Sequence, residues 1–381
     1  MIEFARQIMN ALPGTMSLQL FKFAILIKNR KQIKENKKLL KKYTSGKEID
    51  SSFYGNLNEY CVFGSHVGAD LYIMSYFGDN KIKPVSLKAP QGDGDGSDDV
   101  IMICCVKNDL ERVRRVVSHH REIGISRMVF VDNMSTDGTR EYLEDQPVDL
   151  YTQDEAYHAG RKGSWIRQVQ DIYGYDRWYL IVDSDELFTY AGMEEHKIQE
   201  LIRYARSKNV LRVRSMLLDM YPDHELYQKQ VTNDGIYSFD ADYRFFDRDS
   251  YYEAKDGRGY MVRGGPRKRC FESELDHSEP LTKYPLIFAA KEDVWDDHRP
   301  LPYYKNFQSI NVSVLRHYKF MEGDLEKYKM IAQEGRYYNN SANYKIYVDN
   351  GNRVNFCYED SAEYESSKSL NKLSFLESIK W

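Results

Sequence analysis

The chain has 381 residues, of which 42% are hydrophobic, and its formal net charge at pH 7 is −4. These values describe a folded globular protein, and they exclude a disordered chain and a basic protein that binds nucleic acid. The length predicts two or three structural units. The 31 tyrosines suit broad, partly hydrated grooves, but they fit ordinary core and surface positions equally well.

The cysteines and the N-terminal sequence indicate the cellular compartment in which the protein is expected. The five cysteines are scattered and form no C-x-x-C pair, which favours free thiols in a reducing compartment. The N-terminus shows no apolar segment followed by a small-residue cleavage site. The most apolar stretch, Leu20–Ile27, is interrupted by Lys22 and is too short to span a bilayer. We therefore expect a cytoplasmic protein.

Residues 1–95 differ in character from the rest of the chain. Residues 15–43 predict a helix with an apolar start and a basic continuation, where eight Lys or Arg side chains face one acid, Glu35. Through residues 17–43 such a helix either contacts the inner face of the cell membrane or packs on its own domain or a partner chain. The Gly- and Asp-rich segment Ala89–Asp99 predicts a linker after this helical region.

Strands and helices alternate after the linker. Val100–Val106 is a continuous apolar run, as expected for a strand that is covered on both faces. The following residues predict strands at 127–131, 148–151 and 178–182, and helices at 109–123, 139–144 and 164–173. This alternation predicts an α/β fold with a mostly parallel sheet. After residue 190 the pattern predicts a helix at 194–207, strands at 210–218, 237–246, 260–262 and 310–320, and a helical or loosely ordered tail from Ser361.

Three of the predicted strands end in polar clusters, at Lys107–Asn108, Asp132–Asn133 and Asp183–Glu186. Ligands of such sheets bind beyond the carboxyl ends of the strands. Carboxylates at the end of an apolar strand are costly unless a cation is bound. Their hard oxygens suit Mg²⁺ or Mn²⁺ bridging to a diphosphate. Asp183 and Asp185 are therefore candidate metal ligands, although they also fit a surface turn that caps a helix.

These motifs resemble a known family. CVKND, VFVDNMSTDGT and WYLIVDSDELF, in this order and spacing, are similar to family 2 glycosyltransferases, and more narrowly to a bacterial branch with VKNE, DNxSxDGT and DxDE signatures. Further segments that resemble this branch are LLDMYPD (217–223), RGGPRKR (263–269), LTKYPLI (281–287) and LRHYKF (315–320). The resemblance covers residues 98–325. It implies a GT-A fold with a Rossmann-like central sheet flanked by helices, a sugar-nucleotide donor, and inversion at the anomeric carbon.

The resemblance also implies a division of the chain and roles for particular residues. We expect an N-terminal helical region and linker at 1–95, a GT-A domain at 96–325 and a C-terminal helical extension at 326–381. The nucleotide pocket would be lined by Lys107, Asn108, Asp132 and Asn133. Asp183 would face the ribose or the metal, and Asp185 would bind the metal. His317 would be a third metal ligand, or it is a packed histidine at a strand end.

The chain departs from the family pattern at two positions. Asp109 stands where the branch has Glu, and Asn133 stands where many members have a second Asp. The second change leaves the base of the donor open, so we expect a UDP- or GDP-linked sugar without choosing between them. The acceptor implied by the family is a glycan or a lipid-linked saccharide.

The expected reaction needs groups that stabilise the departing nucleoside diphosphate and a group that activates the acceptor. A metal and cationic side chains would serve the first need. Arg267 and Arg269 can grip a phosphate in bidentate fashion, or they are surface charges of a basic loop. Inversion needs a carboxylate that takes the proton of the acceptor hydroxyl. Asp219 is the first candidate for this base and Asp276 the second, although either could be structural.

Two other classes of protein remain as alternatives. A sugar nucleotidyltransferase uses a similar sheet, but it carries a Gly-rich loop after the first strand, where this chain has VKNDLERVRR without glycine. A non-enzymatic module that binds glycan or membrane would be a decayed domain. The intact Asp132, Asp183 and Asp185 argue against such decay.

Overall fold

The computed structural model of the chain describes residues 51–63, 72, 75–76, 81–89, 98–157, 159–227, 239–271, 280–295, 298–335, 341–350 and 354–381. The predicted basic helix at 15–43 and residues 90–97 of the predicted linker lie outside these residues. Membrane contact through residues 17–43 therefore stays a prediction. None of the helices in the described ranges is both long enough and apolar enough to cross a bilayer.

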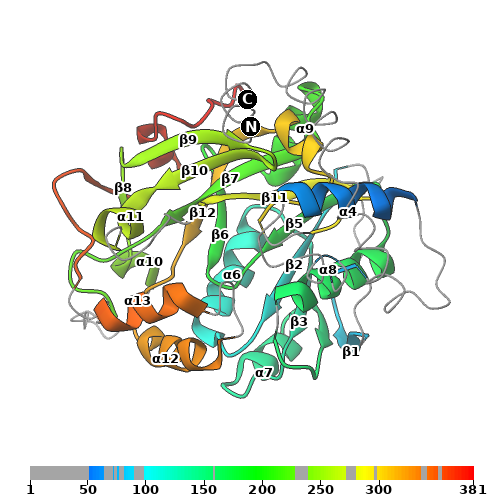
Figure 1. The fold of residues 1–381 in the computed structure, drawn as a ribbon, viewed down its shortest axis with the longest axis horizontal. Helices are drawn as coiled ribbons and strands as arrows, with labels where there is room; N and C mark the ends of the chain where they lie inside the picture. Colours follow the sequence, from blue (N-terminus) through cyan, green and yellow to red (C-terminus); the bar gives the residue numbers. More distant parts are fainter. Residues whose placement is uncertain are drawn as a thin grey trace.

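A nine-stranded sheet forms the centre of the described chain (Figure 1). From one edge to the other its strands are β1 (Lys83–Leu87), β4 (Asp149–Thr152), β3 (Arg127–Asp132), β2 (Val100–Val106), β5 (Arg177–Val182), β11 (Thr282–Ala289), β7 (Arg212–Asp219), β12 (Ile310–His317) and β6 (Glu186–Tyr190). Some strands that are adjacent in the sheet, such as β5 and β11, are distant in the sequence, so that the sheet brings separate segments of the chain close together.

Most strands of this sheet point the same way. β4, β3, β2 and β5 pair in parallel, and β7 pairs in parallel with β12. β11 runs antiparallel to both β5 and β7 between these two groups, and the edge strands β1 and β6 are also antiparallel to their neighbours. Six strands thus run in one direction and three in the other. The predicted α/β class with a mostly parallel central sheet is confirmed.

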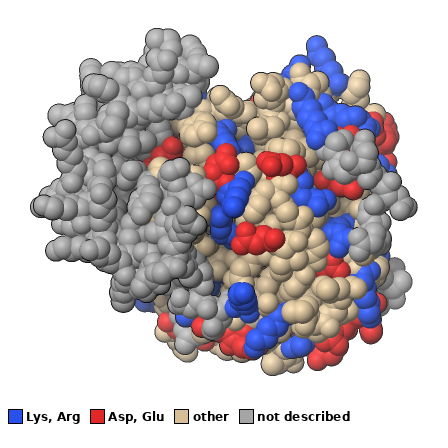
Figure 2. Space-filling view, turned by 90° about the vertical axis from the view of Figure 1, so that its right-hand side faces the viewer, with Lys and Arg blue, Asp and Glu red and all other residues tan. Residues whose placement is uncertain are grey.

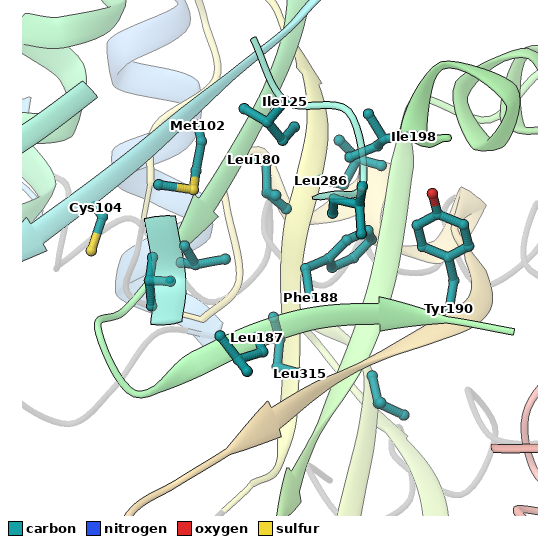
Figure 3. Close-up of a cluster of buried hydrophobic side chains, with 14 of the residues drawn as sticks. Met102, Cys104, Ile125, Leu180, Leu187, Phe188, Tyr190, Ile198, Leu286 and Leu315 are labelled. Carbon is teal, nitrogen blue, oxygen red and sulfur yellow. The ribbon is translucent and has the colours of Figure 1, made fainter. Parts of the chain in front are cut away.

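Helices cover both faces of the sheet. The side chains of β2 alternate, so that Met102 and Cys104 join one buried cluster with Val113 of α6 (Leu110–Glu122). This cluster also includes α9 (Ile198–Ser207), and Figure 3 shows its side chains between the strands. Ile103 points to the opposite face, where it packs with Trp165 of α8 (Ala159–Tyr173). Because both faces are covered, the apolar runs of the central strands are continuous.

The remaining elements lie around this sheet. The helices are α4 (Ser51–Phe63), α7 (Thr139–Glu144), α10 (Phe239–Asp242), α11 (Gly265–Phe271), α12 (Asp324–Glu334) and α13 (Ala342–Asn350), with 3₁₀ helices η1 (Tyr303–Gln308) and η4 (Ser367–Lys372). The strands β9 (Tyr251–Asp256) and β10 (Gly259–Gly264) form a hairpin, and β8 (Phe245–Asp247) pairs with β13 (Ser361–Glu363). On the face shown in Figure 2, side chains of both charges are interspersed.

Segments before residue 96 and after residue 325 contact the central part of the chain. In α4, Asn56 donates to the backbone oxygen of Glu292 at 2.6 Å, and β1 extends the sheet at one edge. At the other end, β13 pairs with β8, and the Trp381 ring stacks on His196 with centroids 4.2 Å apart. The proposed boundaries at 95 and 325 therefore separate segments that pack against one sheet.

Two sequence-based predictions of secondary structure were wrong. The strand expected at 237–246 is α10 followed by β8, because the Asp-rich FDAD has little tendency to form a strand. The tail from Ser361 is neither a regular helix nor loose, since it contributes β13 and η4. The four cysteines with described side chains are free thiols, as predicted: Cys104, Cys105, Cys270 and Cys357.

Candidate metal and diphosphate site

Three carboxylates converge where β5 ends and β6 begins. The chain turns between these strands, and Glu186 N donates to Asp183 O at 3.1 Å. Ligand oxygens of Asp183, Asp185 and Glu186 lie within 4.8 Å of one another. The side chains of Asp183 and Asp185 are 27% and 25% exposed, whereas Glu186 is buried. The turn thus presents two accessible carboxylates beside a buried one.

Two lysines compensate much of this negative charge. Lys162 of α8 places Nζ 2.5 Å from Asp183 Oδ1. The fully buried Lys283 of β11 places Nζ 3.1 Å from Asp183 Oδ2 and 2.6 and 2.8 Å from the two oxygens of Glu186. Burial alone would raise the pKa of Asp183, but Lys162 and Lys283 outweigh burial and hold that pKa below its usual value. For Glu186 burial prevails over Lys283, and its pKa is raised.

His317 links the acidic turn to a second buried ion pair. Its Nδ1 lies 2.7 Å from Asp219 Oδ1, and its Nε2 lies 3.3 Å from Asp185 Oδ2. Arg267 of α11 holds the other oxygen of Asp219, with Nε 2.7 Å from Oδ2. Burial would lower the pKa of His317, but Asp185 and Asp219 outweigh it and raise the pKa. The imidazole is therefore fixed from both sides.

This donor set fits a divalent cation. Carboxylate oxygens are the ligands that Mg²⁺ and Mn²⁺ prefer. When Nδ1–H donates to Asp219, a neutral His317 presents the lone pair of Nε2 toward Asp185. A histidine held this way by a carboxylate is the usual arrangement of a metal-binding imidazole. A metal ion here would have carboxylate oxygens of Asp183, Asp185 and Glu186 within reach, and Nε2 of His317 lies 3.3 Å from Asp185 Oδ2.

A second network ties the acidic turn to the helices around it. Ser184 Oγ donates to Asp109 at the start of α6, with 2.5 Å between the oxygens. Arg112, also on α6, contacts Asp109 Oδ1 at 2.9 Å and donates to both oxygens of Asp324 on α12. Arg112 also donates to the backbone oxygen of Tyr318 at 2.9 Å. The turn is thereby braced by α6, α12 and the segment that follows β12.

The acidic turn opens into a cavity of about 390 Å³. Among the described residues that line it, eight are Lys or Arg and five are Asp or Glu. The basic residues are Lys107, Arg112, Lys162, Arg258, Arg267, Arg299, Lys319 and Lys327, and the acidic residues are Asp109, Asp183, Asp185, Glu186 and Asp324. Three of these cations are paired with carboxylates outside the lining, Arg267 with Asp219, and Arg258 and Arg299 with Asp256. Lys107 and Lys319 have no ion pair among the described residues, and these two suit an anionic ligand.

The structure brings only part of the predicted nucleotide pocket to this cavity. Lys107 and Asn133 line it. Asn108 does not, because its side chain accepts from Thr136 N at 2.7 Å and its φ of 50° belongs to the turn. Asp132 is fully buried and accepts from Ser135 N at 3.3 Å. Its position at the end of β3 makes it a turn-forming residue, so the predicted contact of Asp132 with a base or ribose is not supported.

The predictions for the arginines and the base also need correction. Arg267 lines the cavity, but Arg269 lies away from it, where it pairs with Asp247 at 2.9 Å and donates to the backbone oxygen of Phe356. Asp219 is buried between Arg267 and His317, which together lower its pKa despite its burial. Arg267 and His317 engage both of its oxygens, and Asp219 itself does not line the cavity, so the prediction that Asp219 is the base is not supported. Asp276 lies outside the described residues.

Three functional side chains were missed by the sequence analysis. Lys283 carried a usable signal, because a lysine inside the apolar strand TKYPLIFA must find a buried carboxylate. Lys162 and Arg112 carried none, since Lys and Arg are ordinary residues on helices. Their partners Asp183 and Asp324 are 21 and 212 residues away.

Comparison with known proteins gives likenesses in structure only. No family profile and no curated protein matches the chain. It is similar to a mannosyltransferase from Pyrobaculum calidifontis in complex with GDP-Man and Mn²⁺, at 17% identity over 34% of this chain and 39% of that one, with a TM-score of 0.26. It is also similar to glucosyl-3-phosphoglycerate synthase from Mycobacterium tuberculosis in complex with Mn²⁺, uridine diphosphate and phosphoglyceric acid, at 12% identity over 32% and 43%, with a TM-score of 0.23.

A nucleotidyltransferase is among the similar structures as well. CMP:2-keto-3-deoxy-manno-octonic acid synthetase complexed with CTP matches at 8% identity over 49% of this chain and 71% of that one, with a TM-score of 0.25. The chain spans less than half the length of the two glycosyltransferases it matches.

Proposed function

We propose that this protein is a metal-assisted glycosyltransferase that uses a nucleotide-sugar donor, as the resemblance to family 2 implies. The observation that carries this proposal is the group of three carboxylates within 4.8 Å of one another in a cavity lined by an excess of Lys and Arg. Such a site holds a divalent cation and a diphosphate together. The family resemblance further implies that the sugar is transferred in a single displacement, with inversion at the anomeric carbon.

The metal ligands in this proposal are Asp183, Asp185 and His317. A bound Mg²⁺ or Mn²⁺ supplies positive charge that stabilises the departing nucleoside diphosphate. Asp219 orients the His317 ring, and Lys283 contacts both oxygens of Glu186 and fixes this side chain beside the turn. These supporting contacts hold the ligands in place before the substrate binds.

The nucleotide would lie at the ends of β2 and β3, where Lys107 and Asn133 line the cavity. The Nδ2 group of Asn133 donates to the backbone oxygens of Gln153 and Glu155 at 2.9 and 2.6 Å. Its buried Oδ1 has no hydrogen-bond partner among the described residues. Asn133 Oδ1 is therefore an acceptor left for an N–H group of the base, and the proposal of a UDP- or GDP-linked donor follows from the family resemblance.

The test is a donor assay with the purified full-length chain. UDP-, GDP- and CMP-sugars are incubated with Mn²⁺, with Mg²⁺ or with EDTA, and release of nucleoside diphosphate or monophosphate is measured. We expect metal-dependent turnover of a UDP- or GDP-sugar. Asp185→Asn should abolish it and leave the fold intact, whereas Asp360→Asn, at an exposed aspartate that pairs with Arg248, should not.

Two results would contradict the proposal. Release of inorganic diphosphate from a nucleoside triphosphate and a sugar 1-phosphate, without turnover of nucleotide sugars, would make the protein a nucleotidyltransferase. Failure to bind any of these nucleotides in the presence of Mn²⁺ would favour a non-enzymatic module.

A further inference from the structure

The cavity extends past Asp185 to a second end formed by α12 and α13. The residues that line this end are Lys319, Lys327, Tyr328, Ile331, Asn343 and Tyr344. β12, which leads into Lys319, is four strands from β2 in the sheet, or about 19 Å at ~4.8 Å per strand. In Figure 1, α12 and α13 lie to the left of α6 and β3 lies to its right. By strand order Lys319 is thus remote from β2, whereas Lys327 Nζ lies 3.9 Å from Asp109, two residues after Lys107, where the two ends of the cavity meet.

Lys319 presents a charge at this end that no acid compensates directly. Its Nζ lies 5.0 Å from the ring centroid of Tyr344 and 5.7 Å from those of Tyr328 and Tyr347. In the described part of the chain Lys319 is half-buried, and its ammonium forms no ion pair or hydrogen bond. The rings attract the ammonium and fix its place, but all three of its N–H donors remain for a ligand.

The acids near Lys319 are already neutralised. Arg112 binds both oxygens of Asp324 and one oxygen of Asp109. Lys327 Nζ is 3.9 Å from Asp109, and the Lys327 side chain is 34% exposed. Asp185, the third carboxylate near Lys319, is paired with His317 at 3.3 Å. Lys319 is thus a cation at this end that has no direct ion pair among the described residues.

We propose that the α12–α13 end is the acceptor subsite and that it binds a saccharide acceptor carrying a carboxylate or a phosphate. Lys319 and Lys327 bind the anionic group, and the rings of Tyr328 and Tyr344 contact the sugar. This assignment rests on the function proposed above. In the proposed function the donor phosphates bind the metal at Asp185, between this end and the nucleotide end. The remaining end of the cavity is therefore assigned to the acceptor. An acceptor hydroxyl then approaches the donor sugar from the side opposite the nucleotide.

The test compares anionic and neutral probes by isothermal titration calorimetry on the full chain with UDP or GDP and Mn²⁺. Methyl glucuronide and glucose 6-phosphate are the anionic probes, and methyl glucoside is the neutral one. We expect at least one anionic probe to bind roughly tenfold more tightly than the glucoside. A preference for the glucuronide indicates a carboxylate acceptor, and a preference for the phosphate indicates a phosphorylated one.

Lys319→Met should remove this preference, and Lys319→Arg should retain it. The matched control is Lys329→Met, at an exposed position of α12 that pairs with Glu326, and it should behave as the wild type. Equal affinity of the wild type for all three probes would overturn the subsite. A loss of nucleotide affinity in Lys319→Met, equal to its loss of probe affinity, would assign Lys319 to the donor diphosphate instead. Failure of UDP and GDP to bind the wild type would refute the function proposed above as well.

Discussion

Replacing Lys283 by methionine tests how the acidic turn is held together. Lys283 is fully buried, and the substitution removes contacts of 2.6 and 2.8 Å to Glu186 and of 3.1 Å to Asp183. Glu186 would then be a buried carboxylate beside Asp183 and Asp185, with the backbone N–H of Asp183 as a remaining donor at 2.8 Å. Breaking a buried ion pair from one side costs about 3–5 kcal/mol. We expect Lys283→Met to lower the free energy of unfolding by that amount.

The double variant Lys283→Met/Glu186→Gln separates the charge from the loss of packing. With both charges gone, the cost should fall by at least about 2 kcal/mol, since no carboxylate is left uncompensated. Urea unfolding at pH 7.5 without divalent ions, followed by circular dichroism, measures both values. A loss below about 1 kcal/mol in the single variant, or equal losses in the single and double variants, would refute this account of the turn.

Three further predictions concern pH, metal affinity and the corrected role of an arginine. Burial lowers the pKa of His120 from 6.5 to about 4. As the pH falls, this histidine is therefore protonated in the unfolded chain before it is protonated in the folded chain. The contribution of this group to the free energy of unfolding is fully present above pH 6.5 and falls by about 3 kcal/mol as the pH drops from 6.5 to about 4. Urea unfolding of His120→Asn at pH 7.5 and 4.5 should show a smaller fall than the wild type, and an equal fall would contradict the shift. Asp219→Asn should weaken Mn²⁺ binding about 10–100-fold, because His317 loses the carboxylate that orients it; calorimetry showing unchanged affinity would remove His317 from the ligand set. Arg269→Gln should cost about 1–3 kcal/mol of stability, because the buried Asp247 loses its cation, and it should leave UDP and GDP affinity with Mn²⁺ unchanged; weaker nucleotide binding would restore the role predicted from the sequence.

Local pattern was enough to predict the first half of the sheet. β2 occupies the predicted residues 100–106, and β3 and β5 begin and end within one residue of the predicted bounds. These strands are covered on both faces, so that their apolar runs are unbroken and end at polar residues. For the same reason the sequence placed Asp183 and Asp185 at a strand end beside a cavity.

The contacts that decide the roles of individual residues could not be predicted in this way. β11 enters the sheet between β5 and β7 and brings Lys283 to Asp183 from 100 residues away. Arg267 and Arg269 looked equivalent in sequence, but two positions along a helix point in different directions, and only Arg267 faces the cavity. Asp132 was predicted to contact a ligand because it follows an apolar run. In the structure it is the last residue of β3, paired with Val106 of β2, and its side chain accepts a hydrogen bond from Ser135 N in the following turn.

Anomalous diffraction from crystals grown with Mn²⁺ and UDP or GDP tests the central claim most directly. We predict one Mn²⁺ peak bound to a carboxylate oxygen of Asp185 and to Nε2 of His317, with Asp183 beside it and the diphosphate completing the coordination. A nucleotide bound without Mn²⁺ at these side chains, or an Mn²⁺ peak at other residues, would contradict the claim.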